Sequence, residues 1–307
     1  GKTGYSEYSR PVEGRSLAVP RLSDIVQNAD GSLQIRWNKC AGATKYRIYR
    51  RVGDSGKYER IAEVKSSIRI YNDTNVAAGA TYYYKVIAYN SVNGVTGTGG
   101  YSAEKSYRIE FYEIMGAPGA TEAQMVAYYN QGLAAWQAGN PTRGYHYPAE
   151  VYGGEAPNVE TFVHIIYEEA VAEGVRPEVV LAQTCNETGF LQYTGDVRVE
   201  QRNFAGIGAT GGGVPGYSFP DVRTGIRAQV QHLKAYACND PLVNGCVDPR
   251  FTLVRRGYCK YVEWLGIQEN PNTVWNANGT IASGCGWATA KNYGYILMAG
   301  VNKILTL

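Results

Sequence analysis

Apolar and polar residues alternate in short runs through the first third of the chain, from about residue 20 to 111. Leu33 and Ile35 face one way and their polar neighbours the other, which is the period of a half-buried strand. Residues 46–51 and 82–89 form two more runs, rich in the aromatic and β-branched residues that strands favour. Clusters of Gly, Asn and Asp separate the runs. This pattern predicts an all-β sandwich.

Beyond about residue 116 the apolar spacing changes to three- and four-residue steps, the period of an amphipathic helix. The expected helices run from a capping-box start at Thr121 towards Gln137, from Val159 to a glycine stop at Gly174, through 176–190 with Pro177 in the first turn, through 222–233, and from Tyr293 to Ile304. The irregular stretch 190–220 has room for a small β-hairpin. The second part is therefore expected to be mainly helical.

The length of 307 residues allows two domains, and 44% hydrophobic with 19% charged residues is typical of globular proteins. No apolar run approaches the ~20 residues of a membrane span. The 30 basic and 27 acidic residues are too balanced to indicate nucleic-acid binding. Because the cysteines and histidines form neither Cys-x-x-Cys nor His-x-x-x-His, we expect no metal and no cofactor.

The six cysteines leave their pairing open. Cys238 and Cys246 bracket a turn-rich loop that a disulfide would close in an oxidising compartment, and Cys259 with Cys285 is a second candidate pair. The apolar neighbours of the remaining two, Cys40 and Cys185, favour buried free thiols.

The helix expected over 176–190 carries Glu187 near its end. A glutamate there opposes the helix dipole, and the helix around it is apolar on several sides. Burial raises the pKa of a carboxyl group and keeps it protonated, which suits a general acid. The alternative is a surface carboxylate at a helix end. Helical geometry points Glu187 almost opposite to Cys185.

Two short motifs carry a family resemblance. The run Ala182-Gln183-x-x-x-Glu187-Thr188-Gly189 is followed, sixteen residues after the glutamate, by Asn203-Phe204-Ala205-Gly206-Ile207. The pair resembles the bacterial glucosaminidases of glycoside hydrolase family 73, the cell-wall autolysins. That resemblance implies a mainly α, lysozyme-like (α+β) catalytic domain. It also implies an endo-β-N-acetylglucosaminidase that cleaves the β-1,4 bond between N-acetylglucosamine and N-acetylmuramic acid in peptidoglycan strands, with Glu187 as general acid.

The same resemblance implies a set of substrate-binding residues, namely Gln183, Asn203, Phe204, Gly206, Trp287 and Tyr293. Phe204 and Trp287 would wall the groove, and Asn203 would bind the sugar or hold its loop. Trp287 stands where the family has a tyrosine, so a hydroxyl role does not carry over, whereas stacking on a sugar face does.

A second carboxylate would complete the usual glycosidase pair. Asp221 is one candidate, with the N-cap of the following helix as its alternative role. Asp196 and Glu200 lie between the two motif halves and are further candidates.

The strand containing Trp37 and the runs 46–51 and 82–88 resemble a fibronectin type III module, with Tyr82 as its corner tyrosine. Gly4-Tyr5-Ser6 recurs as Gly100-Tyr101-Ser102, an offset of 96 residues and about one such module. We therefore expect residues 1–12 to be the tail of a preceding module, 13–113 a complete module and 114–307 the catalytic domain. The partners would then include other cell-wall modules of the same longer chain, secreted by a bacterium to its cell wall or surroundings.

Three alternatives stay open at this point. A muramidase or lytic transglycosylase has a similar fold and one key glutamate, and a non-catalytic protein would bind cell-wall glycans without cutting them. A cysteine hydrolase would pair Cys185 with His232. The glycine-rich stretch 206–213 lacks the Gly-Lys-[Ser/Thr] ending of a phosphate loop, so we expect no nucleotide site there.

Overall fold

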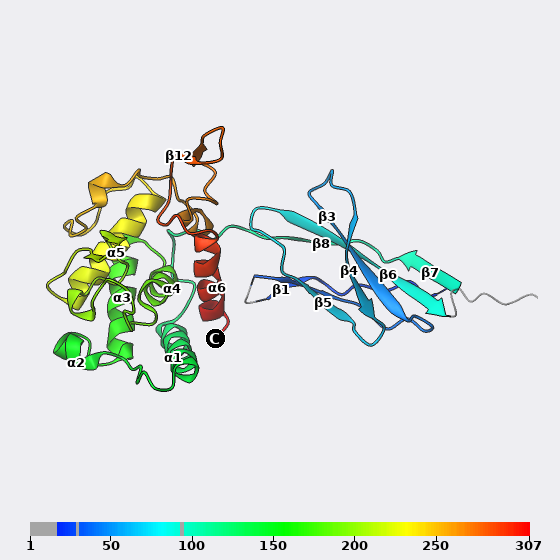
Figure 1. Cartoon of the computed structure of the whole chain (residues 1–307), viewed down its shortest axis with the longest axis horizontal. Coiled ribbons are helices and arrows are strands. Elements are labelled where there is room, and N and C mark those ends of the chain that lie inside the picture. The colour runs from blue at the N-terminus through cyan, green and yellow to red at the C-terminus, as the bar shows by residue number, and fades with distance from the viewer. Residues whose placement is uncertain (1–16, 29–30, 93–94) are drawn as a thin grey trace, which may run out of the picture. The chain divides into compact units, whose positions relative to one another are not determined.

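The computed structural model describes residues 17–28, 31–92 and 95–307. The chain divides into two compact units, one ending at Glu110 and the other running from Phe111 to Leu307 (Figure 1). The expected tail of a preceding module, residues 1–12, lies outside the described residues.

The first unit is built from two antiparallel sheets. One has the order β1 (Val26–Gln27), β2 (Leu33–Arg36), β5 (Ile70–Asp73). The other has the order β4 (Glu59–Lys65), β3 (Lys45–Val52), β6 (Thr81–Val92), β7 (Val95–Tyr101), and β8 (Lys105–Arg108) also pairs with β6. Strands from both sheets contribute to one buried cluster, so the predicted β-sandwich is confirmed.

Strand alternation places the core of this sandwich. Leu33 and Ile35 of β2 are fully buried together with Tyr46 and Ile48 of β3. At the start of β6, the hydroxyl oxygen of Tyr82 accepts a hydrogen bond of 2.8 Å from the backbone N–H of Ala77, five residues upstream. This is the contact of a corner tyrosine, as predicted.

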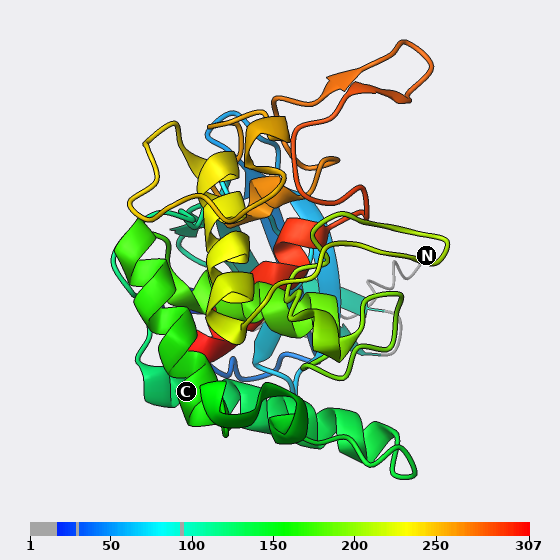
Figure 2. The same ribbon diagram turned by 90° about the vertical axis from the view of Figure 1, so that its left-hand side faces the viewer.

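The second unit is mainly helical (Figure 2). Its helices are α1 (Glu122–Gly139), α2 (Ala149–Tyr152), α3 (Val159–Glu173), α4 (Pro177–Thr188), α5 (Val222–Ala237) and α6 (Tyr293–Leu305). Short 3₁₀ turns lie at Gly153–Glu155, Val199–Gln201, Phe251–Leu253 and Val262–Leu265. Two small hairpins pair β9 (Ala209–Gly211) with β10 (Val214–Pro215) and β11 (Val274–Trp275) with β12 (Ile281–Ser283). The mainly helical prediction and its five long helices are confirmed.

Helix α4 lies inside this unit, in contact with α1, α3 and α6, while α5 packs on α3. All residues from Pro177 to Cys185 are buried. The helix starts with Pro177 in its first turn and ends at Gly189, which adopts the left-handed conformation that stops helices. A helix buried on every side holds its last turn rigidly, and Glu187 belongs to that turn.

The sequence did not predict α2 or the β11–β12 hairpin, which are short and have no clear apolar period.

The two candidate disulfides are also absent, since all six cysteines are free thiols. Cys246 is exposed and its Sγ points to the carbonyl oxygen of Asp248, 3.6 Å away, while Cys238 ends α5. Cys40 and Cys185 are buried, as expected.

Among the described residues, no helix combines the length and apolar character that crossing a membrane requires.

Candidate active site

A pocket of about 590 Å³ opens beside the end of α4. Its walls come from the last turn of α4, the segments 193–197 and 205–210, helix α5, and the segment 287–293. The side chains with chemical functions in this lining are Asn186, Glu187, Tyr193, Asp196, Thr210, His232, Tyr236, Arg250, Trp287 and Tyr293. Segments more than a hundred residues apart in the sequence therefore share one cavity.

Glu187 meets this cavity with a solvent-accessible side chain. The surrounding walls nevertheless remove much of the water that would stabilise a carboxylate, and this desolvation raises the pKa of Glu187. A hydrogen bond from the Tyr293 hydroxyl opposes the rise without cancelling it. The carboxyl group is thus held towards its protonated form, which a general acid requires.

A line of buried polar side chains supports that tyrosine. Gln183 donates from Nε2 to the Tyr293 hydroxyl oxygen at 3.1 Å, and Gln229 donates from Nε2 to Gln183 Oε1 at 3.0 Å. Thr184 closes the line by donating to Gln229 Oε1 at 2.9 Å. These partners fix which end of each amide is the oxygen and which is the nitrogen. Because Gln183 donates to the Tyr293 hydroxyl oxygen, the Tyr293 hydroxyl donates its own hydrogen to Glu187 Oε1.

The start of α6 brings Tyr293 to this place. The next residue, Gly294, lies so close to the 3₁₀ turn Val262–Leu265 that an added Cβ would sit 2.4 Å from the carbonyl oxygen of Glu263. A glycine here lets the first turn of α6 approach that backbone. Burial is the main cause that raises the pKa of Tyr293, and the charge of the Glu187 carboxylate adds to it. The phenol therefore stays a neutral donor.

The loop after α4 is held by Asn203, which is fully buried. Its Oδ1 accepts from the N–H of Ile207 at 2.9 Å, and its Nδ2 donates to the carbonyl oxygens of Ile207 and Tyr217, each at 3.0 Å. Inside this loop Gly206 has a φ of 62°, and a Cβ on it would lie 3.9 Å from Glu187 Oε2. The backbone at Gly206 therefore borders the oxygen of Glu187 that Tyr293 does not hold.

The opposite wall is aromatic. The half-buried Trp287 ring lies edge-to-face with His232, with ring centroids 4.8 Å apart, and Tyr236 lies 5.8 Å from Trp287. His232 and Tyr236 are one turn apart on α5, which places both on the pocket side of that helix. An indole beside a polar cavity offers a flat apolar surface for a sugar ring.

The structure brings together part of the set expected from the sequence. Glu187, Gly206, Trp287 and Tyr293 line the pocket, and Asp196 does so as well. Gln183 and Asn203 are fully buried behind it, where they support Tyr293 and the 203–207 loop instead of contacting a sugar.

Phe204 does not wall the groove as expected. It is 1% exposed and packs against Phe162 and Tyr152, with ring centroids 5.1 and 5.8 Å away. An aromatic residue in a motif fits a core and a groove wall equally well in sequence, and here the core takes it.

The expected catalytic candidate Asp221 is outside the pocket lining. It is the N-cap of α5, where Oδ1 accepts from the N–H of Thr224 at 2.6 Å. Glu200 is also outside the lining, in the 3₁₀ turn Val199–Gln201. Among the described residues, the carboxylates that line the pocket are Glu187 and Asp196.

Cys185 does not face this cavity. It is 1% exposed within the hydrophobic core, and burial raises the pKa of its thiol. Nδ1 of His232 instead contacts Asp248 Oδ2 at 2.7 Å. The geometry therefore gives no support to a Cys–His pair. The His232–Asp248 contact was not predicted from the sequence. The spacing of His232 and Tyr236 on one face of α5 was the available signal that His232 lies in the pocket.

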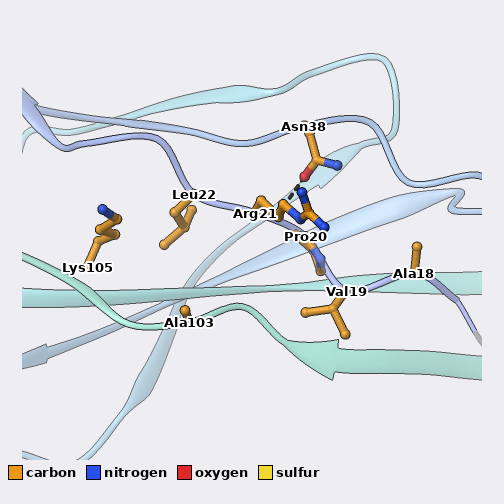
Figure 3. A pocket seen from close by; sticks show the side chains of 8 residues that line it. All are labelled: Ala18, Val19, Pro20, Arg21, Leu22, Asn38, Ala103 and Lys105. Atoms are coloured by element: carbon orange, nitrogen blue, oxygen red, sulfur yellow. Dashed lines mark hydrogen bonds between the residues drawn. The ribbon is translucent and has the colours of Figure 1, made fainter.

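The sandwich has a pocket of its own, of about 540 Å³ (Figure 3). Its lining combines aliphatic side chains with Arg21, Asn38 and Lys105, and Figure 3 shows Asn38 accepting a hydrogen bond from the backbone N–H of Arg21 at 2.6 Å. Among the described residues that line it, none is an acid of the kind that a general-acid mechanism needs. The described residues also contain no cluster of three or more His, Cys, Asp or Glu arranged to hold a metal.

Residues 163–305 match the glucosaminidase family model, described as mannosyl-glycoprotein endo-beta-N-acetylglucosaminidase. The matched region runs from α3 to the last residue of α6 and contains Glu187, Gly206, Trp287 and Tyr293. The match confirms the predicted family resemblance for the helical unit and supports a glycosidase function there.

Curated relatives match shorter stretches. An uncharacterised protein of Borreliella burgdorferi is 44% identical over 99 residues, or 32% of this chain, and the chain spans 48% of that protein's length. An amylopullulanase of Thermoanaerobacterium saccharolyticum is 32% identical over 78 residues, which is 25% of this chain and 6% of the enzyme.

Solved structures with similarity to the chain include fibronectin type III domains. A Fn3-like protein from Clostridium thermocellum is 33% identical over 32% of this chain and 99% of its own, with a TM-score of 0.27. The structure titled FN3tt mut is 24% identical over 31% of this chain and 97% of its own, with a TM-score of 0.24.

Proposed function

We propose that this chain is a peptidoglycan hydrolase, an endo-β-N-acetylglucosaminidase that cleaves the β-1,4 bond between N-acetylglucosamine and N-acetylmuramic acid. The observation that carries the proposal is Glu187, a carboxyl group whose pKa is raised in a pocket large enough for sugar rings and whose Oε1 is fixed by Tyr293. The glucosaminidase family match over 163–305 supports a glycosidase in the helical unit.

In this mechanism Glu187 donates its proton to the oxygen of the leaving sugar as the glycosidic bond breaks. Since Oε1 already accepts from Tyr293, the transferable proton sits on Oε2, the oxygen that borders Gly206. Positive charge then develops on the sugar ring in an oxocarbenium-like state. Asp196, the other carboxylate of the pocket, stabilises that charge or activates the water that completes hydrolysis.

Trp287 supplies the apolar face on which one sugar ring stacks. The sandwich serves as a spacer or as an adaptor towards the wall, and the chain acts outside the cell, where peptidoglycan lies. The adaptor is then the unit that ends at Glu110 and the enzyme the unit from Phe111 to Leu307, three residues before the expected boundary between 113 and 114.

Product analysis tests the bond. Purified peptidoglycan is digested with the wild-type chain, the new ends are reduced, and the products are identified by mass spectrometry. Reduced N-acetylglucosamine ends are expected. Reduced muramic acid ends would instead indicate a muramidase. Anhydromuramic acid ends, which cannot be reduced, would indicate a lytic transglycosylase. Absence of digestion, with retention of the chain on the wall, would indicate a glycan-binding protein.

A further inference from the structure

His232 is a pocket residue to which the proposed mechanism gives no task. It lies on α5, lines the same cavity as Glu187 and Trp287, and is 6% exposed. A polar ring that is nearly buried needs partners for its nitrogens. Nδ1 has one in Asp248, at 2.7 Å from Oδ2. Among the hydrogen bonds of the described residues, none involves Nε2.

The Asp248 side chain is fixed in this position. Its carboxylate is buried at 4% exposure, and its other oxygen, Oδ1, accepts from the backbone N–H of Arg250 at 2.9 Å. The backbone N–H groups of Val247 and Asp248 both donate to Oε1 of Gln231, at 2.8 and 3.2 Å. Gln231 and His232 are neighbours on α5, so these two residues together hold the loop that carries Asp248 against the helix.

The imidazole ring is also held sideways. Tyr236 lies edge-to-face with it at 5.2 Å and Trp287 at 4.8 Å between ring centroids. The ring can therefore neither swing out of the pocket lining nor turn its Nδ1 away from Asp248.

This geometry fixes which nitrogen carries the hydrogen in the neutral ring. A carboxylate only accepts, so Nδ1 bears the hydrogen and Nε2 keeps a lone pair. Nε2 lies across the ring from Asp248 and has no protein donor. The site thus holds a pre-oriented hydrogen-bond acceptor beside an indole face.

We propose that the His232–Asp248 pair is a saccharide-binding dyad, in which Nε2 of His232 accepts a hydrogen bond from a hydroxyl group of the sugar that stacks on Trp287. This inference rests on the proposed function, because it takes the ligand to be an amino-sugar strand. It adds a specificity element: a sugar lacking that hydroxyl, or modified at it, leaves Nε2 unpaired and binds less well.

The test is made in the Glu187→Gln variant, so that binding can be measured without turnover. The probe is a soluble tetramer of β-1,4-linked N-acetylglucosamine, and calorimetry measures its Kd. His232→Phe keeps an aromatic ring and removes the acceptor. Asp248→Asn keeps the size but offers an amide donor to Nδ1, which shifts the hydrogen to Nε2 and turns the acceptor into a donor. His232→Phe is expected to raise the Kd about 5- to 10-fold, the effect of one lost hydrogen bond. Asp248→Asn is expected to raise the Kd less, because the hydroxyl group can turn and accept from Nε2–H.

His164→Phe is the matched control, since His164 is exposed on α3 and contacts Glu122 and Glu168 away from the pocket. It should leave the Kd unchanged. In the chain with Glu187 intact, His232→Phe and Asp248→Asn should raise KM for soluble glycan fragments while kcat stays within about threefold.

The outcomes separate this inference from the proposed function. A wild-type chain that digests peptidoglycan, together with variants whose Kd and KM are unchanged, overturns the dyad and leaves the hydrolase intact. A loss of thermal stability with unchanged Kd also overturns it, because a purely structural pair predicts that result. A parent chain that neither binds the tetramer nor digests the wall contradicts both proposals.

Discussion

Asp73 in the sandwich is a buried carboxylate, whereas Glu187 in the helical unit is a solvent-accessible carboxylate in a pocket, and their partners differ. Asp73 is 2% exposed and accepts from the Arg50 guanidinium at 2.8 Å, from the Tyr84 hydroxyl at 2.8 Å and from the N–H of Asn75 at 3.1 Å. Its charge is matched by a cation inside the fold. Among the described residues Glu187 has one hydrogen-bond donor, the Tyr293 hydroxyl, and no ion-pair partner, and it opens to a pocket.

The difference shows that a carboxylate paired with a cation stabilises the fold, whereas a carboxylate without such a partner in a pocket is suited to react. A carboxylate that pairs with a cation and accepts from several donors joins strands together. A carboxylate with one donor, in a pocket whose walls remove water from it, is favoured in its neutral form. The second arrangement costs stability, and such sites are maintained where a protonated acid is useful.

The largest expected effect lies in the sandwich. Asp73→Asn removes the charge that pairs with Arg50 and should destabilise that unit by about 3 kcal/mol, because a partly buried guanidinium is left without its counter-ion. Hydrogen exchange of peptides covering β3 and β6 should accelerate, whereas hydrolysis per folded molecule should not change. Equal exchange in variant and wild type would show that Asp73 does not hold the two sheets together.

Glu263 extends the comparison to a carboxylate outside the pocket. It is 3% exposed, and burial raises its pKa to about 7, with the backbone N–H of Tyr112 as a donor at 3.2 Å. Since the folded chain binds this proton more tightly than the unfolded chain, the free energy of unfolding should fall as the pH rises from about 4.5 to about 7.

Glu263→Gln should remove that contribution, on the order of 3 kcal/mol between the two ends of the range. Urea unfolding at pH 4.5 and pH 8 measures it, with Glu200→Gln as an exposed control. A pH dependence that is the same in Glu263→Gln and in the wild type would show that this group is not the source.

Asp196→Asn tests the second carboxylate of the pocket. We expect kcat on peptidoglycan to fall about 100-fold with little change in KM, because the charge is needed when the transition state forms and not when the sugar binds. Asp221→Asn is the comparison, since its amide oxygen still caps α5. A larger loss in Asp221→Asn than in Asp196→Asn would reverse the assignment.

Tyr293→Phe should have the smallest effect of these, about a 5- to 10-fold lower kcat from the loss of one hydrogen bond to the acid. Because that bond lowers the pKa of Glu187, its removal should move the alkaline limb of the pH–rate profile upward. Tyr128→Phe, a tyrosine of α1 outside the pocket lining, serves as control. A downward shift of the alkaline limb would contradict the placement of the phenol hydrogen.

Local patterns predicted the parts of the molecule that depend on neighbouring residues. The capping box of α1, the glycine stop of α3, the alternation of β2 and the acid at the end of α4 each occupy a few consecutive positions. Tyr82 was also predictable, since its partner Ala77 is five residues away.

Contacts between distant segments could not be predicted in the same way. Tyr293 reaches Glu187 from another helix, and Asp248 reaches His232 from a loop without any apolar period. Phe204 shows a different limit. Its residue type suits the core and the groove wall alike, and the volume between Tyr152 and Phe162 decides between them.

The most direct test of the central claim is the rate of peptidoglycan digestion by the wild type, by Glu187→Gln and by Glu200→Gln, each checked for folding by circular dichroism. Glu187→Gln keeps the shape of the side chain but has no proton to donate, so we predict at least ~100-fold less product than from the wild type. Glu200→Gln makes the same chemical change outside the pocket and should digest the wall at the wild-type rate. Full activity in a folded Glu187→Gln variant would contradict the assignment of Glu187 as the acid.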